Sequence, residues 1–175
     1  MITAAIVLAE AAVLHENLTA TQTQTYGPEA RGGATRTDVI ISDSPIRFPK
    51  ANQPNVLVCL TQQAYNKFHN IIRPGGLLLS DSRYVKPESK VDARQVQLPM
   101  YQSVMEQIGK PIVFNICMLG AVLGLTEIVK SESIMKVLAN RIPSRFLEMN
   151  RQALNLGVAL GAGLGAAQQF GGANS

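Results

Sequence analysis

One short stretch of the chain combines residue types that suit an anionic ligand such as a phosphate or a carboxylate. Residues 26–33 read Tyr-Gly-Pro-Glu-Ala-Arg-Gly-Gly. Gly32 and Gly33 allow backbone conformations in which N–H groups approach an anion closely. Arg31 offers a planar fork of donors, and Arg36 follows closely enough along the chain to assist it. This loop is therefore our first candidate for chemistry.

The remaining residues of the loop have properties that suit contact with a ligand or with a partner protein. Pro28, after Gly27, stiffens the entry to the loop. Tyr26 can stack on a base or fill a pocket at an interface. Glu29 does not favour phosphate, so we expect it to pair with a cation of a partner or with Arg31. Three interpretations stay open: a ligand contact, a docking surface for another subunit, or a folded loop with no direct role.

Other residues with reactive side chains favour simpler roles. Asp81 follows an apolar strand, where we expect it to cap a turn rather than to contact a ribose or an interface. His15 and His69 lie near helix ends, where a positive charge is mildly favoured. Cys59 and Cys117 each lie inside an apolar run, which is typical of buried, inert thiols in a reduced, cytosolic protein. Nothing resembles a Ser/His/Asp arrangement or a pair of acid/base carboxylates.

Composition limits the classes of function that remain. The chain has 175 residues, of which 46% are hydrophobic and 16% charged, so we expect one domain with a substantial core. The net charge of +4 is weak evidence for an anionic partner. No basic run is interleaved with aromatic residues, so we expect no nucleic-acid binding. There is no Cys-x-x-Cys and no pair of His at ligand spacing, so we expect no zinc and no iron–sulfur cluster held by this chain.

The sequence gives little sign of a membrane or export segment. Residues 154–167 are weakly polar, but they contain Asn155 and are too few to cross a bilayer. Gly157, Gly161 and Gly165 recur along this stretch, and we expect them to form a smooth helix face packed closely in a soluble core or interface. The N-terminus has no charged region of the secretory type. We expect a cytoplasmic protein without a membrane partner.

The elements that must position the loop alternate along the chain. Apolar or alternating runs predict strands at residues 19–25, 35–42, 55–60, 77–80 and 91–98. Helical patterns predict helices at residues 2–16, 61–70, 101–108, 115–128, 131–141 and 143–167, with Thr61 and Ser131 as N-caps. This order predicts an α/β, Rossmann-like domain with a mainly parallel sheet flanked by helices and a helical C-terminal part. We expect a single domain over residues 1–175, with residues 170–175 as a frayed tail.

The predicted order opens on a helix, whereas a doubly wound domain normally opens on a strand and a glycine-rich turn that receives a phosphate. Either this fold begins with a helix, or Met1 is not the natural start. We expect the second, with a strand of about six residues and a glycine-rich turn missing from the sequence. Half of the phosphate cradle would then be missing too, and the isolated chain would bind any ligand weakly.

Residues 26–42 resemble the signature of the gamma subunit of 2-oxoacid:acceptor oxidoreductases, thiamine-dependent enzymes that use ferredoxin or a similar acceptor. Residues 57–64, 74–81, 115–120 and 150–153 are similar to further segments of that family in the same order, so the resemblance covers essentially the whole chain. Family members usually begin with a strand and a Gly-Gly-Gln-Gly-Val turn. This sequence lacks that turn, and Met1 stands where the family commonly has the Val.

The resemblance implies a subunit of a larger enzyme rather than a self-sufficient one. Such enzymes cleave a 2-oxoacid oxidatively, release carbon dioxide and pass the acyl group to coenzyme A. The family's alpha and beta subunits bind thiamine diphosphate with Mg, and its beta or delta subunits hold the iron–sulfur clusters. The gamma subunit packs on alpha and helps to form the coenzyme A site.

For this chain, the resemblance implies no catalytic residue, no metal and no cofactor bound by the chain alone. It implies a contact with coenzyme A or with the alpha subunit, made by Tyr26, Gly27, Pro28, Glu29, Arg31, Gly32, Gly33 and Arg36. The loop pattern favours a 2-oxoglutarate enzyme, although pyruvate, branched-chain and indolepyruvate enzymes share the scaffold. Two alternatives remain: a purely structural assembly subunit of the same complex, and a stand-alone nucleotide-binding Rossmann-like protein.

Overall fold

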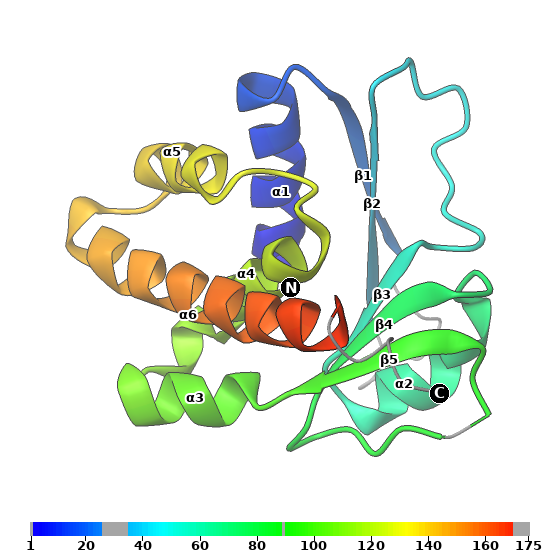
Figure 1. The fold of residues 1–175 in the computed structure, drawn as a ribbon. Coiled ribbons are helices and arrows are strands. Elements are labelled where there is room, and N and C mark those ends of the chain that lie inside the picture. Colours follow the sequence, from blue (N-terminus) through cyan, green and yellow to red (C-terminus); the bar gives the residue numbers. More distant parts are fainter. Residues whose placement is uncertain (1, 26–34, 89, 170–175) are drawn as a thin grey trace.

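The computed structural model describes residues 2–25, 35–88 and 90–169 (Figure 1). Every predicted helix and strand is present, with bounds that differ from the predicted ones by a few residues. Single-turn 3-10 helices follow α2 (His69–Ile71) and precede α4 (Pro111–Val113). The elements are α1 (Ile2–His15), β1 (Thr19–Thr25), β2 (Arg36–Ser42), β3 (Val56–Cys59), α2 (Gln62–Phe68), β4 (Gly76–Asp81), β5 (Ala93–Leu98), α3 (Met100–Gln107), α4 (Phe114–Thr126), α5 (Ser131–Arg141) and α6 (Ser144–Gln169).

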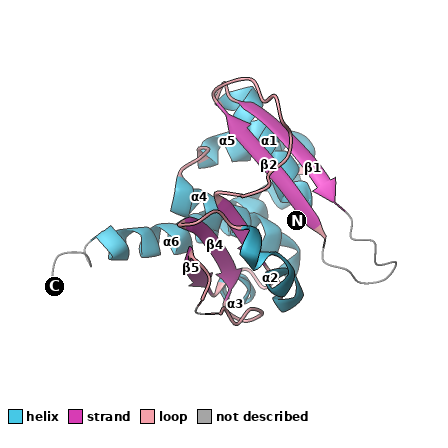
Figure 2. Cartoon of the chain, turned by 90° about the vertical axis from the view of Figure 1, so that its right-hand side faces the viewer, coloured by secondary structure: helices cyan, strands magenta, loops and turns pink. Residues whose placement is uncertain are grey.

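The described strands form two separate sheets (Figure 2). β1 and β2 make an antiparallel hairpin in which Thr19 lies opposite Ser42. β3, β4 and β5 make a parallel sheet in that order, with Val56 beside Leu77. The parallel sheet and the helical C-terminal part confirm the predicted α/β class. No pairing joins β2 to β3 among the strands that the structure describes.

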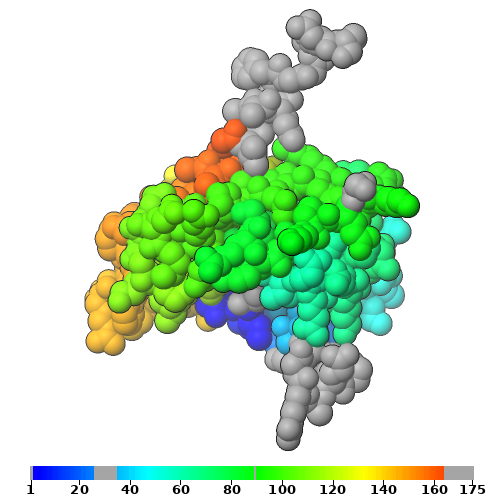
Figure 3. Space-filling view, turned by 90° about the horizontal axis from the view of Figure 1, so that it is seen from below, coloured from blue at the N-terminus to red at the C-terminus, as the bar shows by residue number. Residues whose placement is uncertain are grey.

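The parallel sheet is covered on both faces, with β4 at its centre. Leu78 and Leu79 are both 0% exposed, and successive side chains of a strand point to opposite faces. Leu79 joins the larger core beneath α1 and α4, whereas Leu78 packs with Tyr65 of α2. Figure 3 shows the molecule from below, where β5 and α3 (green) lie across the surface. Burial on both faces explains why these strands are continuous apolar runs in the sequence.

Asp81 joins the end of β4 to the start of α3. Its side chain is fully buried. One carboxylate oxygen accepts the backbone N–H of Arg83 at 2.9 Å, and the other accepts the backbone N–H of Tyr101 at 2.8 Å. The second bond satisfies an N–H that the first turn of α3 leaves unpaired. The capping role predicted for Asp81 is confirmed.

The two predicted helix caps have different outcomes. Thr61 caps α2, because its hydroxyl accepts a backbone N–H of that helix at 3.1 Å. The prediction for Ser131 was wrong, because the N-cap position of α5 is Lys130 and no side-chain cap bond forms there. Glu16 of the preceding part of the chain accepts instead from the N–H of Lys130 at 3.2 Å and from the hydroxyl of Ser133 at 2.5 Å. A carboxylate suits the positive end of a helix better than a hydroxyl, and this one ties the end of α1 to α5.

The closest contact between helices joins α4 to α6. A Cβ atom at Gly157 would lie 1.9 Å from the carbonyl oxygen of Cys117, and one at Gly120 would lie 2.2 Å from that of Leu154. Only glycine fits at such positions, so the smooth face predicted for α6 is confirmed at Gly157. Gly165 lies beyond the side chains that the structure describes. Four glycines form this α4–α6 contact: Gly120, Gly124, Gly157 and Gly161.

Candidate functional site

Arg36 is the one member of the predicted ligand or partner contact that lies in the described part of the chain. The others fall outside the described residues: Tyr26, Gly27, Pro28, Glu29, Arg31, Gly32 and Gly33. The register of the hairpin pairs Thr25 with Arg36. Both ends of the predicted loop therefore start from the same end of the β1–β2 hairpin.

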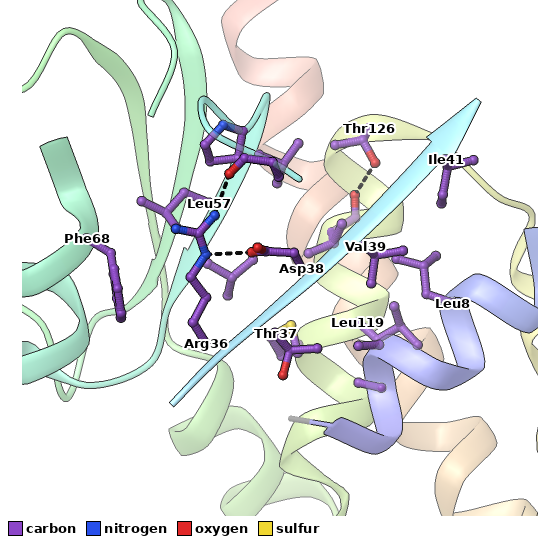
Figure 4. Close-up of a pocket in the computed structure, with 18 of the residues that line it drawn as sticks. Leu8, Arg36, Thr37, Asp38, Val39, Ile41, Leu57, Phe68, Leu119 and Thr126 are labelled. Carbon is purple, nitrogen blue, oxygen red and sulfur yellow. Dashed lines mark hydrogen bonds and ion pairs between the residues drawn. The ribbon is translucent and has the colours of Figure 1, made fainter. Parts of the chain in front are cut away.

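Arg36 is oriented by contacts within the chain (Figure 4). Its Nε donates to a carboxylate oxygen of Asp38 at 2.6 Å, and its Nη2 donates to the carbonyl oxygen of Ala51 at 2.5 Å. The guanidinium carbon lies 5.9 Å from the centre of the Phe68 ring. A guanidinium has five N–H donors, and these two hydrogen bonds use two of them. Arg36 thus anchors the base of the hairpin, and its part in anion binding stays a prediction.

Arg36 and Asp38 lie beside an apolar cavity of about 220 Å³ between β2 and β3. β2 contributes Val39 and Ile41 to its lining, and β3 contributes its apolar residues. Helices α1 and α4 supply further lining residues, as does α2. In Figure 4, Leu8 of α1 and Leu119 of α4 lie near Val39, while Phe68 of α2 lies on the far side of Arg36. We call this space the β2–β3 cleft.

The β2–β3 cleft offers little polar chemistry. The Arg36–Asp38 pair carries one charge of each sign, and the two side chains are 23% and 19% exposed. The hydroxyl of Thr126 is already used, since it donates to the carbonyl oxygen of Val122 at 2.7 Å. The cleft is also smaller than typical small-molecule pockets, which span about 300–1,000 Å³. Its chemistry suits apolar side chains better than phosphate.

The structure places two arginines around a hollow that the sequence analysis did not predict. Arg73 and Arg94 line a second hollow, of about 380 Å³, around the turn Gly75–Gly76. The two arginines come from a turn and from a strand that are distant in sequence, so no local pattern could have indicated the pairing. The N–H of Gly75 is bonded to the carbonyl of Asp92 at 3.1 Å and that of Gly76 to the carbonyl of Arg73 at 2.9 Å. This turn therefore has no backbone donor left for an anion at these two glycines.

The thiols and one histidine have the structural roles that the sequence predicts. Cys59 and Cys117 are both buried, and burial raises the pKa of each thiol to about 12. The negative charge of Asp81 adds to the raised pKa of Cys117. His69 stacks on Tyr65 with ring centres 5.1 Å apart, and its Nδ1 donates to the carbonyl oxygen of Tyr65 at 2.9 Å. The expectation of buried thiols is confirmed, and their inertness stays a prediction.

Among the described residues, no three or more His, Cys, Asp or Glu side chains are grouped so that they could hold a metal ion. Over the same parts of the chain, none of the helices has the length and apolar character needed to span a membrane.

Comparison with known proteins gives consistent matches. The model of the family described as pyruvate ferredoxin/flavodoxin oxidoreductase matches residues 1–160. The 2-oxoglutarate synthase subunit KorC of Methanocaldococcus jannaschii is 45% identical over 159 residues, which are 90% of this chain and 85% of that relative.

Solved structures show the same fold. The gamma subunit of a keto/oxoacid ferredoxin oxidoreductase from Geobacter sulfurreducens PCA superposes with a TM-score of 0.82 at 35% identity, over 92% of this chain and 90% of that one. A 2-oxoglutarate:ferredoxin oxidoreductase from Magnetococcus marinus, solved with 2-oxoglutarate, coenzyme A and succinyl-CoA bound, also gives 0.82. It is 20% identical and is matched over 93% of this chain and 29% of that one, so it shows the fold alone.

Proposed function

This chain belongs to the pyruvate ferredoxin/flavodoxin oxidoreductase family as a gamma-type subunit, and on that premise we propose that it completes a 2-oxoglutarate:acceptor oxidoreductase. One observation carries the proposal: the 45% identity, over 90% of the chain, to a 2-oxoglutarate synthase subunit. The complex would oxidise 2-oxoglutarate, release carbon dioxide and transfer the acyl group to coenzyme A. Its working place is the cytoplasm, where the two free thiols stay reduced.

The proposal divides the chemistry among subunits. Thiamine diphosphate with Mg and the iron–sulfur clusters belong to partner subunits of the alpha, beta and delta types, and ferredoxin or a similar acceptor takes the electrons. This chain packs on the alpha subunit. The resemblance of residues 26–42 to the family signature supports this division.

We assign the coenzyme A contact to the loop of residues 26–33 with Arg36. Coenzyme A presents phosphates, for which Arg31 offers a fork of donors and Gly32 and Gly33 offer backbone N–H groups. Tyr26 suits the adenine ring by stacking. Arg36 holds the base of the hairpin from which the loop starts, through its bonds to Asp38 and Ala51. The whole proposed contact comprises Tyr26, Gly27, Pro28, Glu29, Arg31, Gly32, Gly33 and Arg36.

The coenzyme A dependence of 2-oxoglutarate oxidation by the reconstituted complex tests this assignment. We expect Arg31→Ala to raise the apparent KM for coenzyme A by about 3- to 10-fold while the complex stays assembled, because one charge-assisted contact is lost. Arg151→Ala is the matched control, since Arg151 lies on α6 in an exposed pair with Glu148 at 3.4 Å. An unchanged KM in an intact complex would remove the coenzyme A role and leave a structural assembly subunit.

The substrate is tested separately from the loop. The complex containing the unaltered chain is supplied in turn with 2-oxoglutarate, pyruvate and a branched-chain 2-oxoacid, and kcat/KM is measured for each. We expect the largest kcat/KM for 2-oxoglutarate. A larger value for pyruvate would overturn the substrate proposal without affecting the assignment of the loop.

A further inference from the structure

Three aromatic rings and an arginine meet at the carboxyl ends of β4 and β5. Tyr84 lies in the turn after β4, Tyr101 in the first turn of α3, and Phe114 at the start of α4. The rings of Tyr84 and Tyr101 pack edge to face with their centres 5.3 Å apart, and those of Tyr101 and Phe114 do so at 5.6 Å. The guanidinium carbon of Arg83 lies 5.3 Å from the centre of the Tyr101 ring and 5.8 Å from that of Tyr84.

Part of this cluster is open to solvent, on the side of the molecule where α3 lies at the surface (Figures 1 and 3). Arg83 is exposed, Tyr84 is 41% exposed, and Met105, one turn after Tyr101 on α3, is 39% exposed. Tyr, Phe, Met and Arg are enriched at protein–protein interfaces, whereas Lys, Asp and Glu are depleted there. We call this surface the Arg83 patch and define it by five residues: Arg83, Tyr84, Tyr101, Met105 and Phe114.

The guanidinium of Arg83 is supported by two rings but has no carboxylate partner. Among the described residues, its side chain forms neither a hydrogen bond nor an ion pair. The oxygens of Asp81 accept the backbone N–H groups of Arg83 and Tyr101 instead. The carboxylate of Glu106, on α3, accepts from the side chain of Gln102 at 2.8 Å. The five N–H donors of the Arg83 guanidinium therefore remain available to an acid from outside the chain.

The Arg83 patch lies apart from both of the hollows described above. One hollow lies between β2 and β3, and the other lies around the turn Gly75–Gly76, where β4 begins. A small ligand needs a concave site that buries most of its surface, so the patch fits the surface of another protein better. Tyrosine and arginine carry much of the binding energy at such surfaces when apolar neighbours exclude water from them.

We propose that the Arg83 patch docks a partner subunit of the oxidoreductase complex. An aspartate or glutamate of that subunit binds the guanidinium of Arg83, and apolar side chains around it pack on Tyr84 and Met105. A planar guanidinium matches the two oxygens of a carboxylate, and the rings orient it before the partner arrives, which lowers the cost of ordering it. This inference rests on the proposed function, in which the chain is a subunit, and it uses none of the residues assigned to coenzyme A.

The affinity of this chain for the remaining subunits of the complex tests the proposal. The dissociation constant is measured by sedimentation for the unaltered chain and for variants of the patch. We expect Arg83→Glu to raise Kd by at least about 30-fold, because it sets a like charge against the carboxylate of the partner. Arg83→Lys should raise Kd by about 3- to 10-fold, because an ammonium keeps the charge but loses the bidentate geometry. Tyr84→Ala should raise it by about 10-fold.

Arg145→Glu is the matched control. Arg145 also lies over an aromatic ring, 4.7 Å from the centre of Phe146, and both residues are exposed on α6. We expect this variant to change Kd by less than about twofold, because small effects are usual for surface changes outside an interface. Because the Arg83 side chain bonds to no other described residue, Arg83→Glu should shift the Tm of the free chain by less than about 3 °C.

Three results would overturn the proposal. The first is an unchanged Kd for Arg83→Glu, and the second is an equal rise in Kd for Arg83→Glu and Arg145→Glu. The third is saturable binding of pyrophosphate to the free chain that Arg83→Glu alone abolishes, which would identify a phosphate site. Each Kd is measured without 2-oxoacid or coenzyme A, so a complex that prefers pyruvate, or an unchanged KM for coenzyme A in Arg31→Ala, would contradict the proposed function and leave the docking surface intact.

Discussion

The α4–α6 contact and the β2–β3 cleft represent opposite ways of packing in one small molecule. At the α4–α6 contact, glycines bring the two backbones so close that a single added methyl group would collide with a carbonyl oxygen. At the β2–β3 cleft, two strands with apolar side chains stand apart and leave about 220 Å³ between them. One region is closely packed, and the other is open.

The difference follows from what each kind of element needs. A helix satisfies its backbone hydrogen bonds internally, so two helices need only matching surfaces to pack. A strand satisfies half of its backbone groups through each neighbour, so an edge remains open until another strand arrives. The helices of this domain can therefore pack closely through their own side chains, whereas the facing edges of β2 and β3 have no strand partner in the described part of the chain.

The largest effect is expected from breaking the α4–α6 contact. Gly157→Ala would place a Cβ atom 1.9 Å from the carbonyl oxygen of Cys117, so the helices must separate. We expect a loss of more than about 3 kcal/mol in the free energy of unfolding, measured by denaturant titration. Gly163→Ala on the same helix is the matched control, because nothing lies within 4 Å of its added methyl group. It should stabilise the protein by up to about 1 kcal/mol through helix propensity, and equal losses in both variants would contradict this account.

A pair of leucine truncations sharpens the comparison. Leu154 is 0% exposed beside Gly120, whereas Leu57 is half-buried and lines the cleft. We expect Leu154→Ala to cost about 2–4 kcal/mol in the free energy of unfolding, because it leaves a cavity in a close-packed core. Leu57→Ala should cost about 1 kcal/mol, since its surroundings are already open. A cost for Leu57 as large as that for Leu154 would show that the cleft is closed in solution.

The two thiols report on the opening of each region. Cys117 lies in α4 at the glycine contact, and Cys59 ends β3 at the open edge. Both have a pKa raised to about 12 by burial, so both should react slowly with a thiol reagent at pH 8. We expect Cys59 to react about tenfold faster, because an edge strand opens locally. The variants Cys59→Ser and Cys117→Ser assign the two phases, and the reverse order of rates would contradict the prediction.

The smallest effect concerns the ion pair that joins α1 to α5. A hydrogen bond from Arg141 lowers the pKa of Glu10, desolvation opposes this, and the charge of Arg141 adds to the lowering. The folded pKa lies below the unfolded one, so the stabilisation is present above about pH 4.5 and is lost as pH falls through the folded pKa. Because the two side chains are 41% and 35% exposed, we expect only about 0.5 kcal/mol.

Comparison of pH 6 with pH 3 measures that contribution. Glu10→Gln should reduce the fall in unfolding free energy between the two pH values, and added salt should weaken the effect in the unaltered protein. Glu148→Gln, in an exposed pair within α6, provides the matched control. An identical fall in the protein and in Glu10→Gln would contradict a role for this pair.

Features that depend on local sequence were predicted well. Continuous apolar runs placed β3 and β4, and the hydroxyl of Thr61 marked the start of α2. Asp81 was predicted to cap because it directly follows a buried strand. The repeated glycines of α6 predicted a smooth face because close backbone approach tolerates no other residue. In each case the residue type and its immediate sequence context carried the prediction, even where the partner lies far along the chain.

Features that depend on contacts between residues far apart in the sequence could not be predicted. The carboxylate at the start of α5 belongs to Glu16, which directly follows α1 and lies far in sequence from the serine that local rules favour. Arg36 was predicted to assist in binding an anion. Its hydrogen bond to the carbonyl oxygen of Ala51 could not be predicted, because it forms only when the chain after β2 folds back toward that strand. The separation of β2 from β3 could not be predicted either, since no pattern within these strands indicates whether they pair with each other. Of the candidate site, the structure therefore describes the anchor, and the loop chemistry rests on residue types.

The charged pair at the start of β2 has a consequence for how copies of this protein behave toward one another. An uncovered strand edge with apolar side chains is a template for recruitment of strands from other molecules, and so for aggregation. Arg36 and Asp38 lie at the start of β2, where a wholly apolar strand from another molecule would have to remove water from both charges. The pair therefore discourages chance pairing between molecules at one end of β2, whereas Val39 and Ile41, farther along the strand, are apolar and carry no such charge.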